Sequence, residues 1–278
     1  MRLLILGDVV GMPGLLAIRQ QLPKLRERFT PDLVLANAEN VSNGTGITPN
    51  LYKKLLEAGI DGMTLGDHCY KKNHILPILE KADNLIRPAN LSPHALGVIS
   101  MLLRPREDLP SVYVFTVLGR IMMNMPANDP FAAADTMIER RPDPDAVIIV
   151  EIHAETTSEK VAMGWHLNGR AAVVFGTHTH IPTRDARILP EGVPNHDTAG
   201  GTAYISDLGM CGPVDSVLGR RLDRVLKHMT TNMPAPFDVA EGNPQVQGIF
   251  VEIAGNNRAT AIEPFTVCAD PGHPPFVD

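Results

Sequence analysis

The sequence predicts an α/β fold in which two mixed sheets pack face to face and helices cover the outer surfaces. Over the first half of the 278-residue chain, short apolar runs that suit buried strands alternate with segments that suit helices. This alternation is typical of βαβ units and of a largely parallel sheet. From residue 202 onward, strand-like runs dominate, so we expect the second half to supply a more antiparallel sheet.

The individual elements follow from these runs and from local start and stop signals. The early strands are expected at residues 3–6, 33–36, 63–65, 147–152 and 173–175, and the later ones at 202–205, 237–240, 246–253 and 259–265. Helices are expected at residues 14–28, 49–58, 73–82, 131–140, 158–167 and 218–229. Pro23 predicts a kink in the first helix, and Thr48 can cap the second.

Composition predicts one domain. A chain of this length with 44% hydrophobic residues can bury one substantial core, and no repeat or long polar linker divides it. We expect a single domain over residues 1–269. Residues 270–278, which include three prolines, form a tail unsuited to a helix or strand.

Charge and cysteine content exclude several classes of protein. The formal charge of -6 argues against broad attraction to nucleic acid, although a small anion held at metal ions remains compatible with it. No stretch approaches the roughly 20 apolar residues that span a bilayer. Asp8 interrupts the apolar start, which favours a first strand over a signal peptide. The three cysteines are odd in number and widely spaced, so we expect a reduced, cytoplasmic protein.

Potential metal ligands follow five of the predicted strands. They are Asp8, Glu39, Asn40, Asp67, His153, His178 and His180. Each has an ordinary explanation by itself: Asp8 could cap a helix, and an isolated His-x-His pair is more often an exposed strand end. Because open α/β sheets form their sites at the carboxyl ends of strands, five such junctions together predict one metal centre.

The spacing of His178 and His180 suggests two ions. Residues at i and i+2 of an extended segment project to the same side, so two imidazoles could face two ions. In two-metal sites the ions lie roughly 3.5 to 4 Å apart, which lets one carboxylate bridge them. Glu39 is the candidate bridging ligand. Asp8 and Asn40 would supply the remaining oxygen ligands of the first ion.

His68 is expected to play a different part. In an extended strand end it would point away from its neighbour Asp67 and would not bind the same ion. A histidine beside a phosphorylated sugar can protonate a departing oxygen near neutral pH, so His68 is the candidate general acid.

The motifs, taken in order, resemble those of the YmdB-like metallophosphoesterases of the calcineurin-like superfamily. They are GDVVG at residues 7–11, AEN at 38–40, GDH at 66–68, RPAN at 87–90, HAE at 153–155, TSEK at 157–160, MGW at 163–165, GTHTH at 176–180, TAYISDLGM at 202–210 and VAEG at 239–242. The likeness covers nearly the whole chain.

The resemblance implies a four-layer α/β/β/α sandwich and a dinuclear centre, often assigned as iron. It assigns one ion to Asp8, Glu39, Asn40 and His180, and the other to Glu39, Asp67, His153 and His178. Manganese and zinc also suit these ligands. The implied activity is hydrolysis of 2′,3′-cyclic nucleotides, by attack of a metal-bound hydroxide with His68 as the acid.

The chain departs from the family pattern at two places. Asp67 stands where the family has asparagine, which adds a negative charge and is expected to weaken the ion as a Lewis acid. Residues 193–201 look like an insertion that could shape a substrate rim or a subunit contact.

Two other functions remain open on the sequence alone. One is a phosphomonoesterase or nucleotidase of the same superfamily, and the other is a weakly active regulatory binder that keeps its metal. We also expect a homo-oligomer.

Overall fold

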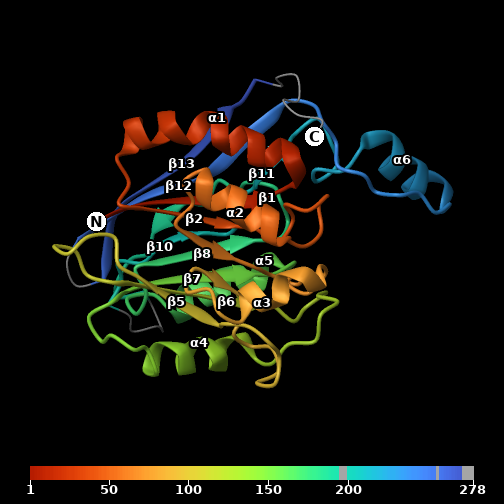
Figure 1. The fold of residues 1–278 in the computed structure, drawn as a ribbon. Helices are drawn as coiled ribbons and strands as arrows, with labels where there is room; N and C mark the ends of the chain where they lie inside the picture. The colour runs from red at the N-terminus through yellow and green to blue at the C-terminus, as the bar shows by residue number, and fades with distance from the viewer. Residues whose placement is uncertain (194–198, 255–256, 271–278) are drawn as a thin grey trace.

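Two sheets lie against each other between outer layers of helices (Figure 1). The computed structural model describes residues 1–193, 199–254 and 257–270. Within these ranges, the first sheet has seven strands in the order β13-β12-β11-β1-β2-β3-β4, and the second has six in the order β5-β6-β7-β8-β10-β9. The predicted α/β fold with two mixed sheets packed face to face is therefore confirmed.

Parallel strands form the centre of each sheet. The first sheet consists of β1 (Arg2–Val9), β2 (Leu33–Asn37), β3 (Gly62–Thr64), β4 (Leu85–Ile86), β11 (Met210–Pro213), β12 (Pro244–Ala254) and β13 (Arg258–Cys268). The second consists of β5 (Ser100–Leu103), β6 (Val112–Leu118), β7 (Val147–His153), β8 (Val173–Thr177), β9 (Arg187–Ile188) and β10 (Ala203–Ile205). Strands β1 to β4 run parallel, as do β6, β7, β8 and β10, so within each sheet their carboxyl ends lie at one edge.

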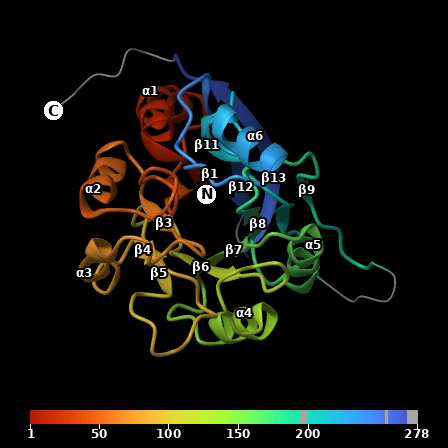
Figure 2. The same cartoon turned by 90° about the vertical axis from the view of Figure 1, so that its right-hand side faces the viewer.

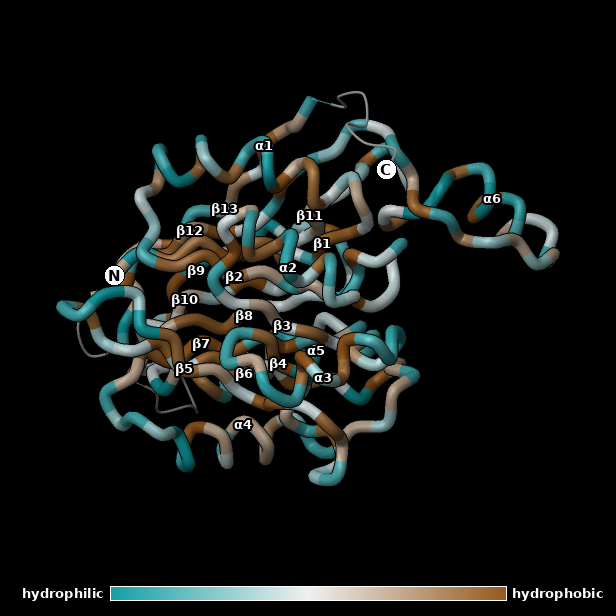
Figure 3. The backbone as a smooth tube through the Cα atoms, in the orientation of Figure 1, coloured by the Kyte–Doolittle hydropathy of each residue, from teal (hydrophilic) through white to brown (hydrophobic). Residues whose placement is uncertain are grey.

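The four layers arise from the alternation of buried side chains. Leu3 and Ile5 of β1 join the core between the sheets, whereas Leu4 and Leu6 join the core beneath the first helical layer. That layer contains α1 (Gly11–Phe29), α2 (Pro49–Glu57) and α3 (Leu76–Leu79), while α4 (Pro130–Glu139) and α5 (Thr157–His166) cover the second sheet. Figure 2 shows these helices around the outside, and Figure 3 shows the most hydrophobic backbone in the sheets.

The sixth helix, α6 (Leu222–Thr231), projects from the body of the molecule (Figure 1). Of its residues, Val225 is buried, and Leu222, Leu226 and Met229 are exposed. None of the helices in the described part of the chain is long and apolar enough to cross a lipid bilayer.

Several predicted elements differ from the structure. The late antiparallel strands do not form a second sheet: β12 pairs antiparallel with β1, which places the β12–β13 hairpin in the first sheet. Residues 237–240 form no strand, because only Val239 pairs, as an isolated bridge with Arg220. The helix predicted over 218–229 begins at Leu222, since Leu218 and Gly219 adopt positive φ angles that a right-handed helix cannot contain.

The remaining helices lie where they were expected, with one reduction. The segment predicted over 73–82 is a 3-10 turn (Asn73–Ile75) followed by the four-residue α3, where Pro77 lacks an N–H. Pro23 lies inside α1. Residues 194–198 of the predicted insertion, and the predicted tail beyond Asp270, lie outside the described residues.

Candidate metal centre

The predicted ligands lie at or just beyond the carboxyl ends of strands from both sheets. Asp8 lies near the end of β1 and His153 at the end of β7. The remaining ligands follow β2 (Glu39 and Asn40), β3 (Asp67) and β8 (His178 and His180). Asp8, Glu39, Asn40 and His153 are buried. The long-range contacts among these residues join the edges of both sheets into one polar cluster.

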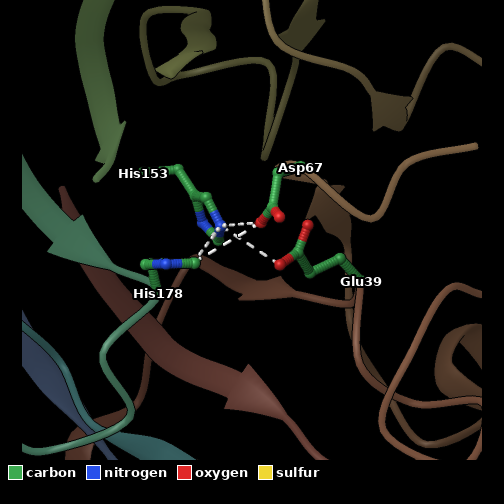
Figure 4. Close-up of side chains that lie close together, drawn as sticks. All are labelled: Glu39, Asp67, His153 and His178. Atoms are coloured by element: carbon green, nitrogen blue, oxygen red, sulfur yellow. Dashed lines mark hydrogen bonds and ion pairs between the residues drawn. The ribbon is translucent and has the colours of Figure 1, made fainter. Parts of the chain in front are cut away.

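Glu39, Asp67, His153 and His178 point toward one another (Figure 4). Nε2 of His153 lies 3.1 Å from Oε1 of Glu39 and 3.2 Å from Oδ1 of Asp67. Nδ1 of His178 lies 3.1 Å from the same His153 nitrogen. One ligand atom from each residue falls within 4.8 Å of every other, so the group could hold a metal ion. Glycine at position 66 leaves space for the His153 ring, because a Cβ there would overlap that ring.

Asp8, Asn40 and His180 form a second group beside the first. Nε2 of His180 lies 3.7 Å from Oδ1 of Asp8. Nδ2 of Asn40 lies 3.4 Å from that Asp8 oxygen, 3.2 Å from Nε2 of His180 and 3.5 Å from Oε1 of Glu39. The same Glu39 oxygen therefore faces both groups.

Each of the three clustered histidines has its outer ring nitrogen engaged elsewhere. Nδ1 of His153 contacts Oγ1 of Thr177 at 2.8 Å, and Nε2 of His178 lies 3.2 Å from Oε2 of Glu155. Nδ1 of His180 donates to the carbonyl of Leu218 at 3.1 Å. A proton held on the outer nitrogen leaves a lone pair on the inner one, which is how metal-binding histidines are commonly oriented.

The extended geometry expected for His178 and His180 was wrong. Strand β8 ends at Thr177, and both histidines have positive φ angles, 91° and 61°. They are therefore part of a turn and not of an extended segment. They still face different groups, since His178 contacts Asp67 and His153 while His180 contacts Asp8 and Asn40.

The extended geometry expected around His68 was also wrong. Strand β3 ends at Thr64, and Asp67 and His68 lie in a turn. Nε2 of His68 is 3.7 Å from Oδ2 of Asp67, so the two side chains are near each other. Nδ1 of His68 contacts Oδ1 of Asn40 at 2.9 Å, and 24% of the side chain is exposed at the edge of the cluster.

Burial and neighbouring charges shift the pKa values of the clustered residues in opposite directions. Burial, reinforced by Asp207 and Glu39, raises the pKa of Asp8 to about 8 despite the opposing effect of His153. Burial also disfavours a charge on His153, but the nearby Glu39 and the hydrogen bonds of Asp67 outweigh it and raise the His153 pKa. Burial would raise the pKa of Glu39 and of Asp67 too, yet contacts with His153 outweigh burial and lower both.

The sequence patterns did not identify the hydrogen-bonded residues that support His153 from behind the ligands. Nδ2 of Asn37 donates to Oε1 of Glu151 at 2.8 Å, and the hydroxyl of Thr177 donates to the same oxygen. Thr177 in turn contacts His153. Glu151 is fully buried, and a charged residue within the apolar run 147–152, two positions before His153, was the available signal.

Comparisons with known proteins agree with the resemblance seen in the motifs. The family model described as YmdB-like protein matches residues 4–265. A 2′,3′-cyclic-nucleotide 2′-phosphodiesterase of Bacillus subtilis (strain 168) is 38% identical over 253 residues, which are 91% of each chain.

Two solved structures are similar over almost their whole length. A hypothetical protein from Thermus thermophilus has 37% identity and a TM-score of 0.86, with 96% of this chain and 99% of that chain covered. A structure described as a novel phosphatase from Mycoplasma pneumoniae has 31% identity and a TM-score of 0.85, with 96% and 93% covered. The names of the Bacillus and Mycoplasma proteins are consistent with the expected phosphoester hydrolase.

Proposed function

Because the chain belongs to the YmdB-like family, we propose that it is a metal-dependent phosphodiesterase that hydrolyses 2′,3′-cyclic nucleotides. The observation that carries this proposal is the convergence of Glu39, Asp67, His153 and His178 within 4.8 Å of one another. The name of the Bacillus subtilis relative, which is 38% identical, supports the choice of substrate.

The donor set fits two ions held side by side. Asp8, Asn40 and His180 would hold one ion, Asp67, His153 and His178 would hold the other, and Glu39 would contribute to both. Three observations support this division: the shared Glu39 oxygen, the separate contacts of the two groups, and the outer polar contacts of all three histidines. Iron is our proposed metal, with manganese or zinc as alternatives that the same ligands suit.

The reaction would combine metal chemistry with a proton from the protein. When bound, two ions would polarise the phosphoryl oxygens and supply the hydroxide that attacks phosphorus in line. His68 would protonate the departing ribose oxygen and so open the cyclic ester. Its Nδ1 is held by Asn40, which leaves Nε2 for the leaving group. Burial lowers the pKa of His68, which makes its protonated ring a stronger acid.

Metal content and product analysis would test this function. The purified protein and a His68→Ala variant would be incubated with 2′,3′-cyclic AMP under Mn²⁺ and under Fe²⁺. Two ions per chain and histidine-dependent ring opening would support the proposal. Metal binding with no turnover of any cyclic nucleotide would reject it.

Two alternatives have specific support, and each predicts a different outcome. The Mycoplasma structure described as a phosphatase favours a phosphomonoesterase or nucleotidase, which would release phosphate from nucleoside monophosphates instead. The extra charge of Asp67 favours a regulatory binder, which would bind nucleotide tightly with negligible turnover.

We also propose that the protein forms a homo-oligomer. The exposed apolar side chains of the projecting α6, together with Met233 and Phe237 beyond it, support this proposal. Sedimentation of the intact chain would test it, and a purely monomeric protein at micromolar concentration would reject it. A cytoplasmic location stays a prediction.

A further inference from the structure

We propose that Lys160 and Asp207 are positioning residues that clamp the turn carrying His178 and His180 and thereby set the geometry of the metal centre. Nζ of Lys160 lies 2.7 Å from Oδ2 of Asp207, and the two side chains are 3% and 1% exposed. Neither residue is among the proposed ligands. The inference rests on the proposed metal centre.

Both Lys160 and Asp207 form hydrogen bonds with Thr179, which lies between the two histidines. The Thr179 hydroxyl donates to Oδ2 of Asp207 at 2.6 Å, and the Thr179 backbone N–H approaches the same oxygen at 3.3 Å. Nζ of Lys160 also donates to the Thr179 hydroxyl at 3.3 Å. Because His178 and His180 are the chain neighbours of Thr179, fixing this residue limits where both rings can lie.

The turn needs such a constraint because its backbone is strained. His178 and His180 both lie in the left-handed region, which residues other than glycine adopt at a cost. Strained backbone of this kind persists only where the surroundings determine it. Asp207 is itself fixed, because its second oxygen accepts from the N–H of Gly209 at 2.8 Å and its own N–H donates to Thr183.

Lys160 connects the clamp to the helical layer. It belongs to α5, and its side chain passes close to Gly176, where an added Cβ would meet the Ser206 carbonyl first and Cδ of Lys160 next. From the other side, Oδ2 of Asp8 accepts the N–H of His178 at 3.2 Å, so a proposed ligand supports the same turn.

Loss of the clamp should weaken metal binding while every proposed ligand stays in place. Residues that orient metal ligands typically change metal affinity by about 10- to 100-fold when they are removed. A turn released from Thr179 can relax toward negative φ, which would turn the two rings away from their partners. A residue with only a structural role would lower the stability of the metal-free protein without this loss of affinity.

The experiment compares substitutions at Thr179, where the hydroxyl can be removed or kept. Thr179→Val keeps the shape and loses both hydrogen bonds of the side chain, whereas Thr179→Ser keeps the hydroxyl. A second variant, Lys160→Met with Asp207→Asn, removes both charges together and so avoids leaving one charge buried alone. The control is Asp135→Asn, which breaks an ion pair of the same 2.7 Å length with Arg170 on the exposed surface.

Affinity for Mn²⁺, the visible spectrum of the Co²⁺-loaded protein and the melting temperature of the metal-free protein would be measured for each variant. We expect Thr179→Val and the double variant to bind about 10- to 100-fold more weakly with altered Co²⁺ bands, and Thr179→Ser and Asp135→Asn to match the wild type. Wild-type affinity in Thr179→Val and in the double variant would overturn the clamp. A wild-type protein that binds no metal would overturn the metal centre itself.

Discussion

Nδ1 of His68 lies 2.9 Å from Oδ1 of Asn40, which joins the proposed acid to a proposed metal ligand. Because the amide oxygen can only accept, Nδ1 of His68 holds a proton in this contact. A second proton on Nε2 gives the imidazolium ring, which is the form that can protonate a departing oxygen. Asn40 thus orients the ring so that Nε2 is the nitrogen that carries the transferred proton.

Replacing His68 by alanine should separate catalysis from metal binding. We expect turnover of 2′,3′-cyclic AMP to fall about 10²- to 10⁴-fold, the usual contribution of a general acid, while metal content stays near that of the wild type. Steady-state kinetics and elemental analysis would measure both. His94→Ala, which changes an exposed histidine, serves as the control. An undiminished rate in His68→Ala would remove His68 from the mechanism.

Glu39→Gln should remove both ions together. Glutamine keeps an oxygen to accept the N–H groups of Gly66 and His68, so the loop can keep its fold. It loses the charge that faces both ligand groups. Elemental analysis should therefore find less than one ion per chain, whereas the exposed Glu57→Gln should retain the full content. A variant that keeps one tightly bound ion would contradict the bridging role.

Asp67→Asn should raise turnover. The substitution removes one negative charge from the centre, which strengthens the ion as a Lewis acid and reduces repulsion of the substrate phosphate. We expect an increase of about 10-fold, since changes around a metal site commonly alter activity on that scale. The measurement is kcat together with metal content at saturating Mn²⁺. An unchanged rate and an unchanged metal content would reject the hypothesis.

Metal binding should release protons near pH 7. Burial raises the pKa of Asp8 to about 8, and Glu39 together with Asp67 raises that of His153 against the effect of burial. Both residues therefore hold protons in the metal-free protein and must lose them to bind an ion, which gives about two protons per centre. Affinity should consequently rise as the pH increases through about 8, where Asp8 loses its proton.

Calorimetric titration of metal at pH 7 would measure this release. Buffers with different ionisation enthalpies should give different apparent binding enthalpies, because released protons are taken up by the buffer. Identical enthalpies in all buffers would show that Asp8 and His153 are already deprotonated.

Gly14→Ala should destabilise the fold although alanine favours helices. A Cβ at Gly14 would overlap the carbonyl oxygen of Cys211, so α1 would have to move away from β11. Overpacking of this kind costs about 1 to 3 kcal/mol. The helix propensity of alanine offsets about 1 kcal/mol. Urea unfolding should show a net loss relative to Arg19→Ala, an exposed change on the same helix. A stabilised Gly14→Ala protein would contradict the close packing.

Local patterns determined much of this fold. Apolar runs located β1, β2, β3, β7 and β8 because buried parallel strands need continuous apolar side chains, and polar residues after those runs identified the candidate ligands. The same reasoning wrongly placed the late antiparallel strands in a second sheet, whereas β12 and β13 belong to the first, because strand pairing is a contact between distant segments. It also missed β6, although its run of residues 112–118 is fully buried.

What the sequence by itself determined is therefore which residue types stand at the strand ends and in what order. Only the tertiary structure decided how they meet. The positive φ angles of His178 and His180 and the contact of Asp207 with Thr179 depend on residues that are distant in the chain. Such geometry arises because buried polar groups must find partners wherever the packed sheets bring them together, and no local pattern records where that will be.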